Sequence, residues 1–185
     1  MKRLLLAVIA VAVGFACGKD PVSYSSPVGI SLDARSGDVT AGQLAVTKNI
    51  NTETGNPYGA FTNAAVQALG RAPSRITVTG ATLSLEPTSS GVTVLEQVLG
   101  AGTTLAFQMN ASGGVYRVAT IAQATGTGPV PMDVSLDSAP MPPGDYADLV
   151  GGSFKVLLTG PAAAGFAAAG GTARMEATLT FVAWE

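Results

Sequence analysis

The stretch MEATLTF, residues 175–181, alternates apolar and polar side chains without a break. Consecutive side chains of an extended strand point to opposite faces, so this alternation collects the apolar side chains on one face. A helix would instead bring residues three and four apart onto the same face. The stretch therefore predicts a β-strand with one face buried in a core and the other in water.

The same alternation recurs along the chain and predicts about eight strands. Their apolar positions are Val28, Ile30 and Leu32; Leu44 and Val46; Ile76, Val78, Leu83 and Leu85; Leu105, Phe107 and Met109; residues 115–121; Val130, Met132, Val134 and Leu136; Phe154, Val156 and Leu158; and the stretch above. Turn signals rich in glycine, proline and aspartate separate these strands at nearly regular intervals. The pattern favours an all-β fold, an antiparallel β-sandwich over residues 28–185.

Two of these strands depart from simple alternation. Ile76 and Val78 are at even positions, whereas Leu83 and Leu85 are at odd positions. A β-bulge at Gly80 would place all four side chains on the same face of one strand. Residues 115–121 include apolar side chains at both odd and even positions. This predicts a strand buried on both faces at the centre of a sheet.

One helix is expected between the strands. Phe61, Ala64, Ala65, Ala68 and Leu69 recur at helical spacing on one face, and Gly70 follows as a terminator. We expect this helix to close one end of the sandwich. At Thr93 and Glu96 a capping-box pattern allows either a helical turn or a further strand.

Composition limits the possible functions of the chain. Its 185 residues suit one domain, and 10 lysines and arginines against 12 acidic residues give a net charge of −2. This slightly negative net charge indicates that nucleic acid is not a partner, because binding to polyanions needs a basic surface. The chain has no histidine, which excludes Ser-His-Asp catalysis and histidine-ligated zinc. We expect no cofactor and no metal.

The first residues have the layout of an export signal. Lys2 and Arg3 precede an apolar run over residues 4–16, and the chain's only cysteine, Cys17, follows. As a helix the run would be about 20 Å long, too short for a hydrocarbon core of about 30 Å. The pattern predicts a signal peptide over residues 1–16 that is removed after export.

The stretch VGFAC, residues 13–17, resembles the lipobox of bacterial lipoprotein precursors, with a small residue directly before the cysteine. The resemblance covers only about the first 20 residues. It departs from the family at Gly14, where a leucine is usual, and residues 14–16 also fit an ordinary signal-peptidase site, which would leave a free thiol.

The resemblance implies a mature chain that begins at Cys17, with a diacylglycerol on its sulfur and an acyl group on its amine. It also implies anchoring in the bacterial cell envelope, and in the outer membrane because Gly18 follows the cysteine. Residues 17–27, rich in serine and proline, are then expected to form a lipidated tether that holds the body off the membrane.

Carboxylate pairs are the remaining route to catalysis, because a glycoside hydrolase needs two of them at a fixed separation. The candidates are Asp145 with Asp148, Asp133 with Asp137, and Glu86 with Glu96. We interpret each pair as the solvent side of a strand or turn. Aspartates at strand ends could also bind calcium, but no spacing matches a calcium loop.

The alanine-rich segment 161–171 allows two interpretations. It predicts either a pliable loop with Phe166 tucked onto the body, or an apolar contact patch. For a partner-binding site, with another envelope protein as the expected partner, the first candidates are Phe166 and the turn that contains Pro143, Asp145 and Tyr146. The sequence thus indicates a non-catalytic structural or binding module. The alternatives are a carrier of an apolar ligand, suggested by residues 115–121, and a carboxylate-dependent glycoside hydrolase.

Overall fold

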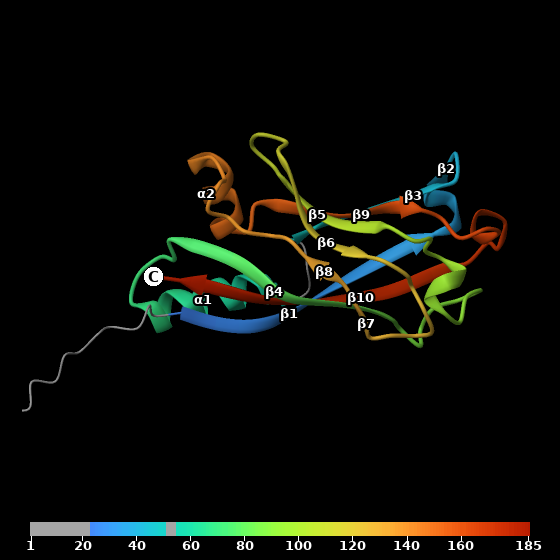
Figure 1. Cartoon of the computed structure of the whole chain (residues 1–185), viewed down its shortest axis with the longest axis horizontal. Coiled ribbons are helices and arrows are strands. Elements are labelled where there is room, and N and C mark those ends of the chain that lie inside the picture. The colour runs from blue at the N-terminus through green and yellow to red at the C-terminus, as the bar shows by residue number, and fades with distance from the viewer. Residues whose placement is uncertain (1–22, 51–54) are drawn as a thin grey trace, which may run out of the picture.

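The computed structural model describes residues 23–50 and 55–185, and these residues form two antiparallel sheets packed face to face. One sheet has the strand order β1-β10-β4-β7 and the other has the order β2-β3-β9-β5-β6-β8. Figure 1 shows the two sheets as separate layers. The all-β prediction is therefore confirmed, with ten strands in the described part of the chain instead of about eight. The strands are β1 (Ser23–Arg35), β2 (Val39–Thr40), β3 (Gln43–Asn49), β4 (Arg75–Leu85), β5 (Thr103–Met109), β6 (Val115–Ile121), β7 (Val130–Pro131), β8 (Asp133–Val134), β9 (Phe154–Pro161) and β10 (Thr172–Trp184).

The stretch MEATLTF lies in β10, at the centre of the four-stranded sheet. It pairs on one side with β1 and on the other with β4. Its apolar residues Met175, Ala177, Leu179 and Phe181 are fully buried, as the alternation predicts. They belong to one continuous core that extends from Val28 to Ala183 and includes side chains of both sheets.

Two bulges account for the irregular strands. The pairing of β10 with β4 shifts so that Thr180 faces Gly80 while Phe181 faces Val78, which confirms the bulge predicted at Gly80. A second shift, in the pairing of β5 with β6, leaves Val118 unmatched, so that Val118 and Ala119 are both buried.

This second bulge corrects the prediction for residues 115–121. Strand β6 has apolar residues at both odd and even positions because of the bulge. It does not lie at the centre of its sheet. Only the two-residue strand β8 lies outside it, and Val115 is 56% exposed.

Strand β1 begins earlier than the sequence suggests. Residues 23–27, assigned to the tether, pair with the end of β10, from Ser23 opposite Trp184 to Pro27 opposite Thr180. Residues 23–27 are mostly serine and proline, so they show no alternation of apolar and polar side chains. Pairing of two strands through backbone hydrogen bonds does not require such an alternation. The tether can therefore extend no further than residue 22.

Helix α1 (Pro57–Leu69) is the predicted helix. The Asn56 side chain accepts a hydrogen bond from the Gly59 amide at its start, and Gly70, with φ +71°, ends it in the left-handed conformation. Tyr58 of α1 contacts both sheets, because its ring lies 5.0 Å from that of Phe154 and 5.2 Å from that of Phe181. The helix thus closes one end of the sandwich, as expected.

A second helix, α2 (Pro143–Gly151), replaces the turn expected around Pro143. Pro143 occupies its first turn, where a missing amide proton costs nothing, and Gly152 ends it with φ +69°. At Thr93 and Glu96 the structure resolves the open question in favour of a short 3-10 turn, η3 (Leu95–Gln97).

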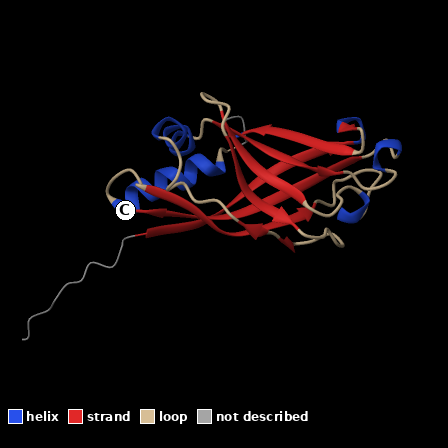
Figure 2. Ribbon diagram, turned by 45° about the horizontal axis from the view of Figure 1, so that its top comes forward, coloured by secondary structure: helices blue, strands red, loops and turns tan. Residues whose placement is uncertain are grey.

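The two ends of the molecule differ (Figures 1 and 2). The end that carries α1, α2 and the C-terminus is called the helix end. The end that carries η3 and the 3-10 turns η1 (Ser36–Asp38) and η4 (Phe166–Ala168) is called the loop end. Strand β1 starts at the helix end, because Ser23 pairs with Trp184, and it runs to the loop end, where the Ser36 amide donates to the Gly171 carbonyl.

Candidate functional site

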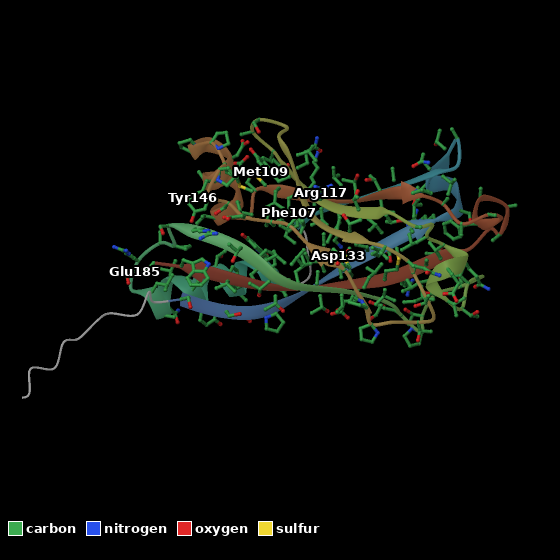
Figure 3. The ribbon with its side chains drawn as sticks, viewed as in Figure 1. Phe107, Met109, Arg117, Asp133, Tyr146 and Glu185 are labelled. Atoms are coloured by element: carbon green, nitrogen blue, oxygen red, sulfur yellow. The ribbon has the colours of Figure 1, made fainter. Side chains whose placement is uncertain are left out.

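The residues predicted to bind a partner do not form one surface. Phe166 lies in η4 at the loop end, whereas Pro143, Asp145 and Tyr146 belong to α2 at the helix end (Figure 1). Figure 3 shows Tyr146 at the helix end with Glu185. The two groups must therefore be considered as separate sites.

Phe166 is only 1% exposed, so it is not a contact residue, and the prediction that it binds a partner is wrong. The loop folds back onto the body because the Ala162 amide donates to Gly42 and the Ala163 amide donates to Val98. The tucked-in interpretation of segment 161–171 is the correct one. Its exposed side chains are Pro161, Ala164, Ala167, Ala168 and Ala169.

Beside this loop lies a shallow hollow of about 320 Å³, here called the loop-end hollow. Its lining residues are Gly91, Val92, Glu96, Gln97, Ala164, Gly165, Phe166 and Ala169. A second hollow of about 360 Å³ shares Val92 with it and has Glu86 at its border. Glu96 is the one charged residue among those that line the loop-end hollow, and a hollow of this size suits one apolar side chain of a partner. Sequence reasoning missed these hollows because their residues come from three loops that are far apart in the chain.

At the helix end, α2 is held against the tip of the β5–β6 hairpin. The Tyr116 hydroxyl donates a hydrogen bond to Asp145, and the Asp148 carboxylate accepts one of 2.9 Å from the Ala111 amide. The Ser112 hydroxyl and then the Tyr116 hydroxyl hold the pKa of Asp145 below its usual range, and the carboxylate raises the pKa of Tyr116. These five residues are called the hairpin clasp.

The hairpin clasp has no room for a substrate. Asp145 is 6% exposed, and a side chain at Gly114 would place its Cβ 2.8 Å from the Asp145 carboxylate. The two carboxylates of α2 bind the hairpin from one side. The prediction that this pair lies on the solvent side of a strand or turn is wrong for Asp145, which is buried in helix α2 against the hairpin.

Tyr146 and Pro143 also differ in exposure. The Tyr146 hydroxyl donates a 2.6 Å hydrogen bond to the Pro73 carbonyl, and burial raises the pKa of its phenol. Its polar end is thus used inside the protein. Pro143 is exposed on the first turn of α2 and remains available to a partner.

The other carboxylate pairs are not brought together as catalytic dyads. Asp137 receives two hydrogen bonds from Arg75, of 2.8 Å and 2.5 Å, which lower the pKa of its carboxyl, while Asp133 is exposed on β8. Glu86 and Glu96 border different hollows. Within the described ranges, no three acidic, cysteine or histidine side chains gather where they could hold a metal ion.

A third hollow, of about 310 Å³, lies between strands β1 and β3. Asp33 and Asp38 face Arg35 and Lys48 along it, so its charges balance and favour neither an anion nor a cation. The Asp38 carboxylate accepts a 2.7 Å hydrogen bond from the Arg35 amide, which closes the turn after β1.

Cys17, with the predicted signal peptide and lipobox, lies outside the described residues. Among the helices that the structure describes, none is long and apolar enough to cross a membrane. No protein-family model, curated protein or solved structure matches the chain.

Proposed function

We propose that this chain is a lipid-anchored protein of a bacterial cell envelope, attached through Cys17, whose β-sandwich acts as a non-catalytic binding or structural module. The observation that carries the proposal is where the described sheets begin. Strand β1 starts at Ser23 and the described core at Val28, so removal of residues 1–16 would take no residue from the described sheets or core. The pattern of residues 1–17 is that of a cleaved and acylated precursor.

Tethering by lipid follows from the chemistry of the anchor. Each buried methylene contributes about 0.8 kcal/mol, so one acyl chain binds marginally while two or three hold a protein stably. The helices of the described body are too short or too polar to cross a membrane.

A binding role is supported by the surface of the loop end. Five residues lie between Cys17 and Ser23, so the helix end is attached to the membrane while the loop end faces away from it. The loop-end hollow and the exposed alanines beside it are then accessible to another envelope protein, which we expect to insert an apolar side chain next to Val92.

The proposal is tested by intact mass of the native protein from the membrane fraction. We expect a chain that begins at Cys17 and carries the mass of a diacylglycerol and a further acyl group. The variant Cys17→Ser should lose the added mass and leave the membrane fraction, while Ser25→Ala, a change outside the lipobox, should behave as the wild type. A native product that retains Met1, or that begins near Cys17 without acyl mass, would contradict lipid anchoring.

A further inference from the structure

Lipid anchoring, if it occurs as proposed, brings one particular surface of the folded body to the membrane. Strand β1 leaves the sandwich at the helix end, and five residues separate Ser23 from Cys17. Even fully extended, six residue steps span only about 20 Å. This is about the length of α1 itself, so the helix end cannot move far from the lipid surface.

Helix α1 lies directly beside this attachment. It packs on the inner face of β1, where the ring of Phe61 is 6.0 Å from that of Tyr24, one residue after Ser23. Its opposite side carries exposed or half-exposed residues, namely Ala60, Asn63, Ala64, Val66, Gln67 and Ala68. This set is called the α1 outer face.

The α1 outer face contains no charged residue, and no charge occurs from Pro57 to Gly70. The next residue, Arg71, is exposed and pairs with Glu185 at 3.2 Å. Contact of the α1 outer face itself with a lipid headgroup layer therefore requires no desolvation of an ion, which is the costly step at such a surface. The outer faces of the sheets differ in this respect, since they carry Asp33 and Glu176 on one sheet and Lys155 and Asp133 on the other.

Apolar burial alone would not bind α1 to a membrane. Val66, which is 40% exposed, is its only large exposed apolar side chain. A short tether changes this because it turns weak binding into an intramolecular contact at an effective concentration in the millimolar range. Contact should therefore depend on the anchor.

We propose that the α1 outer face rests on the lipid headgroup surface of the membrane that holds the acylated chain. The inference rests on the proposed lipid anchoring. It fixes the orientation of the body, with α1 on the lipid and the alanines of the loop end directed away.

Two alanines offer a matched pair for the test. Ala68 on α1 and Ala168 in η4 are both exposed and lie in uncharged segments, but they occupy opposite ends of the molecule. The full acylated protein with Ala68→Cys or Ala168→Cys is labelled with a thiol-reactive fluorophore. It is then placed in vesicles of phosphatidylethanolamine and phosphatidylglycerol that contain brominated lipid as a quencher. Fluorescence of the only tryptophan, Trp184, whose indole donates to Thr77, verifies folding.

A face that settles about 5–10 Å into the headgroup boundary should bring the label at position 68 to the quencher and reduce its emission about twofold or more. The label at position 168 should be unaffected. Cys17→Ser combined with Ala68→Cys, added to the same vesicles, should show no quenching because the tether is absent.

The other outcomes overturn the inference in distinguishable ways. Acylation blocks Cys17, so one label per chain means that the anchor is present, whereas two labels mean that lipid anchoring itself fails. With one label per chain, no quenching at position 68, or equal quenching at both positions, refutes the proposed orientation. Protection at position 68 in native membranes but not in protein-free vesicles would show that a protein covers α1.

Discussion

At the scale of single residues, Tyr58 connects most of the helix end. Its ring packs against Phe154 and Phe181 in opposite sheets, and its hydroxyl donates a 2.8 Å hydrogen bond to the Leu149 carbonyl of α2. Complete burial raises the pKa of the phenol, so the hydroxyl keeps its proton and can donate at any ordinary pH. We therefore expect the aromatic ring of Tyr58 to contribute more to the free energy of unfolding than its hydroxyl does.

Replacing Tyr58 separates these contributions. Tyr58→Phe removes one buried hydrogen bond and should lower the free energy of unfolding by about 1 kcal/mol. Tyr58→Ala leaves a cavity between the sheets and should lower it by about 3–5 kcal/mol. Urea denaturation of both variants measures the difference. Equal losses would mean that the ring adds nothing beyond the hydroxyl.

The hairpin clasp predicts a dependence of stability on pH. Because the pKa of Asp145 is lowered in the folded state, its contribution is present above the unfolded value near 4 and is lost as pH falls through the folded pKa. Asp145→Asn should unfold at a lower temperature than the wild type at pH 7. The gap between the two proteins should narrow as the pH is lowered.

Thermal unfolding followed between neutral and strongly acidic pH measures this convergence. Asp133→Asn, on the exposed strand β8, is the control and should follow the wild-type curve. A constant gap at every pH would show that the charge of Asp145 does not contribute.

At the scale of elements, the same substitution should have opposite effects in a helix and in a strand. At Gly144 in α2 nothing lies within 4 Å of an added Cβ, whereas at Gly160 in β9 it would lie 2.6 Å from the Thr103 Cα. Gly144→Ala should stabilise the protein by up to about 1 kcal/mol through helix propensity. Gly160→Ala should destabilise it by about 1–3 kcal/mol, because backbone must move. Urea denaturation measures the change in the free energy of unfolding for both variants. A Gly160→Ala variant as stable as the wild type would refute the close packing of β9 against β5.

Elements with a regular pattern could be predicted from sequence, and those defined by tertiary contact could not. MEATLTF and the face of Phe61, Ala65 and Leu69 show their period directly. Helix α2 was missed because two prolines, a glycine and an aspartate at its start have the composition of a turn. The four-residue spacing of Asp145 and Leu149 and the terminating Gly152 were its available signals.

The candidate sites were less predictable than the fold. The burial of Phe166 depends on the loop folding back to Val98 and Gly42, contacts that no local pattern encodes. Asp145 was predicted to face solvent and is instead buried, because its partner Tyr116 and the Ala111 partner of Asp148 are more than 25 residues away in sequence. Strand β6 has apolar residues at both odd and even positions, which suggested a central strand buried on both faces. The actual cause is a bulge, and a bulge cannot be recognised until the pairing partner of the strand is known.

At the scale of the whole molecule, the sheet edges differ greatly in length. Three edge strands, β2, β7 and β8, have two residues each, whereas the fourth, β1, has 13 and pairs only with β10 among the described strands. A long unpaired edge is a template for a further strand, and proline opposes this because it has no amide proton. Pro27 lies within β1, and we expect it to oppose such pairing.

Pro27→Val should therefore promote pairing between copies through β1. We expect a larger fraction of dimers or higher oligomers at high protein concentration, measured by sedimentation velocity on residues 18–185. Pro87→Val, in an exposed turn away from β1, should remain like the wild type. An unchanged monomer for both variants would show that other features protect this edge.

The position of β10 also has a consequence for biosynthesis. Strand β10 lies between β1 and β4 but is synthesised after both, so the four-stranded sheet cannot close until residues 172–184 have left the ribosome. A polypeptide that is threaded through a narrow secretion channel has to stay unfolded during its passage. On the export route that we propose, this strand order would delay folding of the nascent chain for that interval, and a stop codon before Thr172 would leave β1 and β4 without the strand that joins them.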